Sequence, residues 1–429
     1  MRRTLARNIF FLAILLGLAA NPGFGDDPAP EENRFDAAIA RIHQSYWQEI
    51  SREELEERAL RALLKELDPY GQLLDATQWG EFRGNLSGTI AGVGVILDSD
   101  ATGGLQRIQR LLVASAAGAA GARPGDRIEA IDGRSLQGVS LDDVFPLLRG
   151  APGTSVRLRL SQPGASPHEI DVVRKIHNLP SVHGVGRDAD GVGDYLLDAA
   201  KGIGYLRIDH LSEDSFEAVR GALEDLTSRQ ASGLVLDLRG SSGGLMMAGV
   251  RIADLFLGEG LVGGAEGREE STRQLATASV SWAGPMVVLI DGDTASSSEF
   301  LAASLRDHGR ARFLGERTFG KGRIQQMYSL GEGRGGLILT TALQVRPSGI
   351  ATDKHDPPPA NESAGVFPDP GLEMHLTDEE LASWRKGLEI RASPSPFTPA
   401  EFAAAGPDPI LDRAVALLTD LEPATPRRP

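Results

Sequence analysis

The chain of 429 residues contains no cysteine, which excludes disulfide frameworks, thiolate metal sites and cysteine nucleophiles. Basic residues are also in deficit, because 44 Lys and Arg stand against 59 Asp and Glu, and the formal net charge is −15. Nucleic-acid binding depends on a basic surface, so we expect no nucleic-acid partner. The 8 histidines include no H-E-x-x-H motif and no pair at metal-ligand spacing, so we expect no metal site.

The amino terminus has the pattern of a secretory leader. Three arginines in the first seven residues precede an apolar run at 9–20, and Gly23 and Gly25 supply the small residues of a cleavage site before Asp26. The run is short for a membrane span, and no later stretch is apolar enough for one. We expect residues 1–25 to be a signal peptide and the mature protein to be exported, periplasmic or extracellular. An uncleaved leader would instead anchor it to the membrane.

The remaining chain is long enough for two or three domains. Residues 26–85 form a predicted helical region, because apolar residues recur at helical spacing over 34–67. Residues 86–173 instead show short β-like runs separated by glycines, a short helix within 114–122 and a second helix near 141–148. The order of these elements resembles a PDZ domain, with Gly92-Val93-Gly94-Val95 at the position of the loop that binds a peptide carboxylate.

Residues 174–392 alternate apolar strands with amphipathic helices, which predicts an α/β core with a sheet covered on both faces. Residues 393–429 are predicted to be a Ser- and Pro-rich linker (393–409) followed by a short helix at 410–418. Within the core, the predicted strands are 204–208, 233–238, 286–290, 312–315 and 336–343, and the predicted helices are 215–230, 245–257 and 296–308.

Three segments of the core follow strands and carry candidate chemistry. Residues 237–244 are glycine-rich and contain G-x-S-x-G around Ser242, the pattern of a nucleophile elbow. Residues 290–300 place Ser296 where a strand passes into a helix, a position that also suits a simple helix cap. Residues 315–322 approach a phosphate-binding loop, but Gly322 replaces the Ser or Thr that would bind magnesium. A triad of Ser242, Asp291 and His308 is possible by order alone.

The spacing of Thr-Ala-Ser-Ser-Ser-Glu (294–299) and Thr-Phe-Gly-Lys-Gly (318–322) resembles the C-terminal processing, or tail-specific, serine peptidase family. The resemblance implies that Ser296 is the nucleophile, Lys321 its general base and Gln325 the residue that orients the lysine. It also assigns the oxyanion hole to Gly243, Gly244 and Ser297. The sequence departs from the family pattern at Ser297, which replaces an alanine, and at Gly240 and Ser241, which replace asparagines.

The resemblance implies an α/β peptidase core of the ClpP/crotonase type with an inserted PDZ domain and helical segments at both ends. The expected function is an exported endopeptidase that needs no cofactor and cuts proteins at or near exposed C-termini. An adaptor protein and pairing of copies through the helical termini are compatible with the family. Two other interpretations stay open, namely a catalytically silent PDZ scaffold and an α/β-hydrolase with Ser242 as nucleophile.

A lysine that acts as a base needs its neutral form, although the pKa of free lysine is about 10.4. Lowering that pKa to about 7.4 costs ~4 kcal/mol, which desolvation of the ammonium can supply. We expect Phe319, two residues before Lys321, to help exclude water from the amine, and Gln325 to align it.

Overall fold

The computed structural model describes residues 33–99, 105–162, 164–268, 270–277, 279–350, 352–355 and 364–420. The expected signal peptide, residues 1–25, lies outside these ranges. The chain divides into two compact units, Met1–Pro69 and Tyr70–Pro429. Among the described residues, no helix combines the length and the apolar character needed to cross a bilayer.

The described part of the first unit is a pair of helices, α2 (Arg34–Ser45) and α3 (Arg52–Leu67). The side chains of Asn33 and Ser51 accept hydrogen bonds from the first turns of these helices, which fixes where each begins. The helical stretch predicted over 34–67 is therefore two helices with one break between them. Few of its apolar side chains are buried, and seven large ones are exposed: Phe35, Ile42, Tyr46, Trp47, Leu60, Leu63 and Leu67.

The second unit begins with a short strand and helix, β1 (Gln72–Leu74) and α4 (Ala76–Ser87), and continues into the domain whose sequence resembles a PDZ domain. An antiparallel pair, β2 (Thr89–Gly92) and β9 (Lys175–Asn178), joins the two ends of this domain. The short helix expected in the alanine-rich stretch is present as α5. The domain contains an antiparallel sheet, in which the strand order is β3 (Val95–Ser99), β4 (Gln106–Leu111), β5 (Arg127–Ile131), β7 (Ser155–Ser161) and β8 (His168–Val173). It also contains the short strand β6 (Arg134–Ser135), which pairs with β5, and the helices α5 (Ala116–Ala119) and α6 (Leu141–Leu148).

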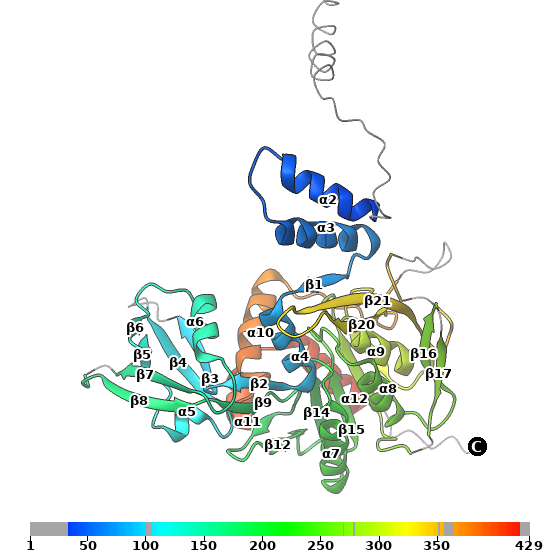
Figure 1. Ribbon diagram of the computed structural model, residues 1–429. Coiled ribbons are helices and arrows are strands. Elements are labelled where there is room, and N and C mark those ends of the chain that lie inside the picture. The colour runs from blue at the N-terminus through cyan, green and yellow to red at the C-terminus, as the bar shows by residue number, and fades with distance from the viewer. Residues whose placement is uncertain are drawn as a thin grey trace, which may run out of the picture. The chain divides into compact units, whose positions relative to one another are not determined.

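The core is built on a parallel sheet whose strands are buried on both faces, as the sequence predicts (Figure 1). Leu234 and Leu236 pack with helices α7, α8 and α9, whereas Val235, between them, packs against α12 on the opposite face. The parallel strands are β14 (Ile203–Ile208), β15 (Gly233–Asp237), β18 (Met286–Ile290) and β19 (Arg312–Gly315); β10 (Val182–His183) and β13 (Leu196–Asp198) pair antiparallel with β14. The helices are α7 (Ser215–Ser228), α8 (Met246–Asp254), α9 (Ser297–Asp307) and α12 (Pro409–Asp420).

A second sheet, which is antiparallel, lies beside the core. The segment that carries the candidate lysine leads directly into one of its strands. Its longest strand, β21 (Gly336–Val345), pairs with strands from three different regions of the chain. These strands are β1, β16 (Leu261–Gly267) and β20 (Arg323–Ser329), and β17 (Ser271–Leu275) extends the sheet beyond β16. A small hairpin, β11 (Gly186–Arg187) and β12 (Gly193–Asp194), lies outside both sheets.

The C-terminal region contains more helix than the sequence indicates. Helix α10 (Asp378–Arg391) is not among the predicted elements, and α11 (Pro399–Ala404) lies inside the predicted linker. The linker prediction is therefore wrong for this part. Thr398 and Glu401 form a reciprocal capping box, because Glu401 N–H donates to the threonine hydroxyl and Thr398 N–H donates to the glutamate carboxylate.

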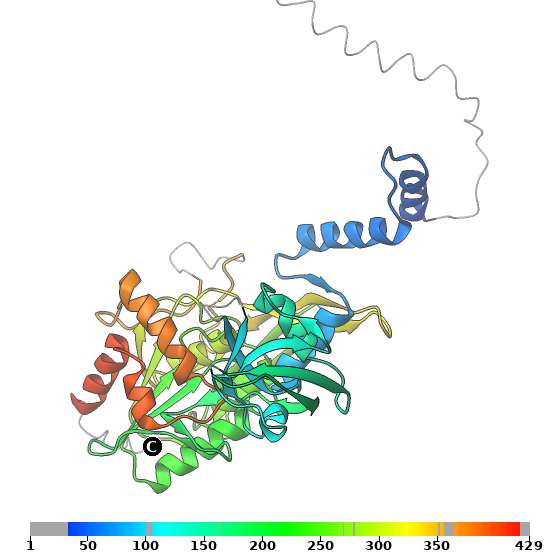
Figure 2. The ribbon, with the colours of Figure 1, turned by 90° about the vertical axis from the view of Figure 1, so that its left-hand side faces the viewer.

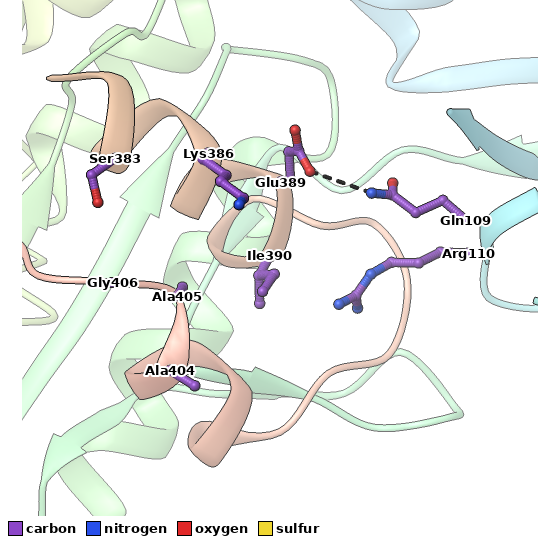
Figure 3. A pocket seen from close by; sticks show the side chains of 9 residues that line it. All are labelled: Gln109, Arg110, Ser383, Lys386, Glu389, Ile390, Ala404, Ala405 and Gly406. Atoms are coloured by element: carbon purple, nitrogen blue, oxygen red, sulfur yellow. Dashed lines mark hydrogen bonds between the residues drawn. The ribbon is translucent and has the colours of Figure 1, made fainter. Parts of the chain in front are cut away.

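Helices α10 and α11 lie beside strand β4 of the PDZ domain (Figures 1 and 2). Gln109 donates a hydrogen bond to Glu389 at 3.3 Å, and Arg110 lies 3.8 Å from the carboxylate of Glu401. Figure 3 shows Gln109, Arg110 and Glu389 around a cavity of about 500 Å³. The PDZ domain therefore contacts the C-terminal helices through polar groups, which are weaker attachments than a packed apolar surface.

Candidate active site

Ser296 occupies a strained turn between β18 and α9. Its backbone angles are φ 57° and ψ −124°, a conformation that costs a non-glycine residue about 1–3 kcal/mol. The turn is held from both sides, because Ala295 N–H donates to Ser241 O at 2.9 Å and Ser296 N–H donates to Glu299 at 3.0 Å. A serine fixed in a strained strand-to-helix turn is typical of a nucleophile.

Glu299 is a buried carboxylate that connects the turn of Ser296 with the turn of Lys321. Its Oε2 accepts hydrogen bonds from Ser296 N–H at 3.0 Å and from Lys321 N–H at 2.7 Å, so the two nitrogens are less than about 6 Å apart. Its Oε1 accepts from the Thr318 hydroxyl at 2.5 Å and from Gly320 N–H at 2.6 Å. Burial raises the pKa of Glu299, and these four donors oppose the rise.

The Lys321 amine has a defined environment. Its Nζ donates to Gln325 Oε1 at 2.9 Å and lies 4.9 Å from the centre of the Tyr70 ring. Gln325 in turn donates from Nε2 to the carbonyl oxygen of Tyr70 at 2.6 Å. The structure thus brings together two residues that the sequence predicts and one that it does not. Phe319 is 40% exposed and its ring centre lies 3.4 Å from the Lys354 amine, so these contacts give no support to the prediction that Phe319 helps exclude water from Lys321.

The glycine-rich segment after β15 lies directly against the serine turn. A Cβ on Gly243 would be 2.8 Å from Ser296 Cβ and 2.9 Å from Ser297 N, so only glycine fits. Among the described residues, the N–H groups of Gly243 and Ser297 have no acceptor, which leaves both available to an oxyanion. Gly244 is held by a bridge to Leu211. The Ser297 hydroxyl is buried and has no hydrogen-bond partner in the described part of the chain.

A buried ion network supports the start of this glycine-rich segment. Arg239 donates to Asp237 at 2.7 and 2.9 Å and to Asp408, from the C-terminal region, at 2.8 and 2.9 Å. Burial by itself would raise the pKa of Asp237, but the ion pair and hydrogen bonds with Arg239 outweigh it and lower the pKa to about 2. The network fixes the chain just before Gly240–Gly244.

We predict that Asp237 makes the stability of the protein depend on pH. Because its pKa falls from 3.8 to about 2 on folding, its stabilisation is complete above pH 3.8 and decreases by about 2 kcal/mol as the pH falls toward 2. Asp237→Asn, measured by urea unfolding, should lose about 3–5 kcal/mol near neutral pH and lack this decrease.

The exposed Asp171, which pairs with Arg157 on the PDZ surface, provides the matched control. Asp171→Asn should leave both the midpoint near neutral pH and its acid dependence close to those of the unchanged protein. An equal acid slope in Asp237→Asn and the unchanged protein would contradict the assignment.

The alternative catalytic arrangements are not assembled. His308 Nε2 is bonded to Leu261 O at 2.8 Å, at the opposite end of α9 from the serine turn. Asp291 accepts from Gly240 N–H at 2.8 Å and from Thr294, so it stabilises loops. Ser242 is exposed. The segment after Gly322 is strand β20 and not the helix that a phosphate-binding loop requires.

In the candidate carboxylate-binding loop of the PDZ domain, two backbone carbonyl oxygens accept hydrogen bonds from other residues of the domain. Val93 O accepts from Ala117 N–H at 2.8 Å, and Gly94 O accepts from Leu112 N–H at 3.0 Å and from the Ser115 hydroxyl at 2.7 Å. In the described residues, the N–H groups of Val93 and Gly94 have no acceptor. A small cavity of about 80 Å³ adjoins this loop, lined by Ile90, Gly92, Val93, Gly94, Val95, Leu112, Phe145, Leu148 and Arg149.

A larger cavity of about 1010 Å³ lies between the PDZ domain and the core. It shares Ile90 and Arg149 with the small cavity. Its other side includes Leu245, next to Gly244, and Met327, two residues beyond Gln325. The lining therefore includes sequence neighbours of the candidate carboxylate-binding loop and of the candidate active site. No group of three His, Asp or Glu side chains in the described ranges is placed to hold a metal ion.

An α/β core that presents a serine at a strained turn, together with a PDZ domain, defines a serine-type peptidase. Residues 202–369 match the Peptidase family S41, and residues 108–161 match the PDZ domain. The chain is 30% identical over 354 residues to a carboxy-terminal-processing protease of Bartonella bacilliformis, covering 81% of this chain and 76% of that protein. It is 33% identical to a carboxyl-terminal-processing protease of Synechocystis sp., covering 78% and 77% of the two chains.

Among solved structures, a photosystem II D1 C-terminal processing protease is similar at 28% identity and a TM-score of 0.42, covering 79% of this chain and 92% of that one. The chain belongs to the carboxyl-terminal-processing proteases of peptidase family S41. The fold class and the peptidase activity expected from the sequence are thereby confirmed.

Proposed function

We propose that this peptidase works through a Ser296–Lys321 dyad. The observation that carries the proposal is the Glu299 carboxylate, which holds the backbones of both residues through one oxygen atom. The neutral Lys321 amine removes the Ser296 proton, and the alkoxide attacks the scissile carbonyl. The ammonium then protonates the leaving amine, and water, activated by the same amine, releases the acyl group from Ser296.

The oxyanion of the tetrahedral intermediate is assigned to the N–H groups of Gly243, Gly244 and Ser297. Ser297 is the first residue of α9, where the helix dipole favours negative charge. Gly243 supports this assignment because it contacts the Ser296 turn without a side chain in between. Gln325 holds the amine by accepting a hydrogen bond from one of its N–H groups, so that the amine keeps one orientation.

The test is cleavage of an unfolded reporter with an apolar C-terminal tail, followed by mass spectrometry of the fragments. Ser296→Ala and Lys321→Met should each reduce kcat by about 10³–10⁴ or more, because the dyad acts as a unit. Ser242→Ala should stay within a few-fold of the unchanged protein. Cleavage that survives Lys321→Met but not Ser242→Ala would replace the dyad with the hydrolase interpretation. Tight tail binding without any cleavage would favour the silent scaffold.

We propose that the PDZ domain presents substrate tails by their terminal carboxylate. Strand β3 pairs only with β4 among the described residues, so its other edge is open to a peptide strand beside α6. The unpaired N–H groups of Val93 and Gly94 suit a carboxylate at the end of that strand. The large cavity offers the rest of the tail a path toward Ser296.

A reporter whose tail ends in a carboxamide tests this tail recognition. Replacing the carboxylate removes charge-assisted hydrogen bonds worth about 1.5–3 kcal/mol, so kcat/KM should fall by about 10- to 100-fold. A reporter amidated on an internal side chain serves as the matched control and should be cut normally. Equal cleavage of the free and amidated tails would refute carboxylate capture.

We propose further that the leader at residues 1–25 exports the protein, as its basic and apolar composition supports. We also propose that two copies pair through α2 and α3, whose exposed apolar side chains exceed what a small isolated helical unit normally shows. Light scattering over a range of concentrations distinguishes a dimer from a monomer.

A further inference from the structure

Tyr70 contacts the catalytic apparatus twice, once through its backbone and once through its ring. Its carbonyl oxygen accepts a hydrogen bond from Gln325 Nε2 at 2.6 Å. Its ring centre lies 4.9 Å from Lys321 Nζ. Tyr70 lies 255 positions before Gln325 and outside the residues that match the peptidase family.

The backbone contact determines which way the Gln325 amide faces. A carbonyl oxygen can only accept, so it selects the NH₂ end of the amide and turns Oε1 toward Lys321. Without this acceptor, the amide is free to flip and present its NH₂ group to the amine. A flipped amide would compete for the lone pair that must receive the serine proton.

The ring contact constrains the amine itself. A neutral amine has two N–H bonds and one lone pair, and Gln325 Oε1 accepts the first N–H. The electron-rich face of the Tyr70 ring lies 4.9 Å from Nζ, too far for a hydrogen bond, but it favours a second N–H that points toward it. With both N–H bonds directed, the lone pair keeps a single direction. After proton transfer, the same ring face is favourable for the ammonium.

The segment that carries Tyr70 is fixed to the sheet that carries Gln325. Strand β1 pairs with β21 through Gln72 and Ile338, and β21 pairs with β20 through Thr340 and Gln325. Figure 1 shows β1, β21 and β20 as neighbours. The His355 ring packs edge-on against the Tyr70 ring, with 5.6 Å between the ring centres. The ring of Tyr70 is therefore held between His355 and the lysine.

We propose that Tyr70 is a positioning residue for the Lys321 amine: its carbonyl orients Gln325 and its ring face directs the second N–H bond. This inference rests on the proposed dyad. It assigns to a residue from the start of the second unit a part in the chemical step. The catalytic arrangement is then complete only when three separate parts of the sequence have come together. These parts contribute Tyr70, Ser296 and Lys321.

The experiment compares Tyr70→Phe, Tyr70→Leu and Lys321→Met in the full chain with the tail reporter. Tyr70→Phe keeps the ring and should stay within about 3-fold of the unchanged protein in kcat. Tyr70→Leu keeps bulk but loses the ring face, and should lower kcat by about 10- to 100-fold with KM changed less than about 3-fold. Tyr328→Leu, an exposed tyrosine on β20, is the matched control and should leave kcat and KM unchanged.

A double-mutant cycle separates positioning from a general structural effect. If Tyr70 acts through the same amine as Gln325, Tyr70→Leu combined with Gln325→Ala should lose little more than the larger single loss. Full additivity, an unchanged kcat in Tyr70→Leu, or a loss confined to KM would overturn the inference. A wild-type rate in Lys321→Met would overturn the dyad and the inference together, whereas an inactive Lys321→Met beside a fully active Tyr70→Leu overturns only the inference.

Discussion

Glu299→Gln is expected to lower kcat by about 10² or more, because the exchange should move both partners of the proposed dyad, and a misplacement of about 1 Å can cost that much. The carboxylate accepts four hydrogen bonds, two on each oxygen. An amide keeps one accepting oxygen, so two donors lose their acceptor and meet an NH₂ group. Each buried donor left unpaired costs about 1–3 kcal/mol, so the free energy of unfolding should fall as well.

Glu380→Gln is the matched control for this prediction. Glu380 closes a capping box at the start of α10, with Thr377 N–H donating to it at 2.8 Å, but it is only partly buried and its contacts are far simpler. Glutamine is acceptable in a capping box, so activity and stability should be unchanged. Steady-state kinetics and urea unfolding measure both variants. If Glu299→Gln were as active as Glu380→Gln, the carboxylate would not be what places the dyad.

Gly243→Ala is expected to lower kcat by about 10²–10³, the loss typical of removing one oxyanion donor. A methyl group there would lie 2.7 Å from Ala295 O and 2.8 Å from Ser296 Cβ, so the loop must move away from the serine turn. The φ of 86° adds strain of about 1–2 kcal/mol for any residue with a Cβ. Acylation rates with the tail reporter measure the loss directly.

A glycine in the neighbouring loop, the one that carries Ser296, tests the specificity of this effect. Gly292 lies in the connection between β18 and α9, and a methyl group on its Cα would have no described atom within 4 Å. Its backbone does not adopt a positive φ. Gly292→Ala should therefore retain the activity of the unchanged protein. A comparable loss in both variants would indicate that general loop rigidity matters and not the contact of Gly243 with Ser296.

The parallel sheet could be predicted from sequence because its strands are apolar without interruption and lie between amphipathic helices. Strand β15 is buried along its whole length, as its composition indicates. Helix α10 escaped prediction because it is polar on most of its surface, with Trp384, Gly387 and Arg391 as its buried residues. The capping box at Thr398 and Glu401 indicates the start of helix α11, but the surrounding prolines and serines led to the prediction of a linker.

The site residues that were predictable are those within short motifs. Lys321 and Gln325 are four residues apart, and the structure places them in contact. Tyr70 could not be predicted, because its contacts with these residues arise only when β1 joins the second sheet. The role of Glu299 was also missed, although its spacing from Ser296 is that of a helix-capping glutamate.

The pairing of Arg239 with Asp408 has a consequence for the order in which the enzyme becomes active during synthesis. Until residue 408 leaves the ribosome, the Arg239 guanidinium lacks one of the two carboxylates that compensate its burial. The glycine-rich segment that follows Arg239 then lacks part of its support, so we expect the proposed oxyanion site to be incomplete. We therefore expect the chain to become active only after Asp408 has paired with Arg239.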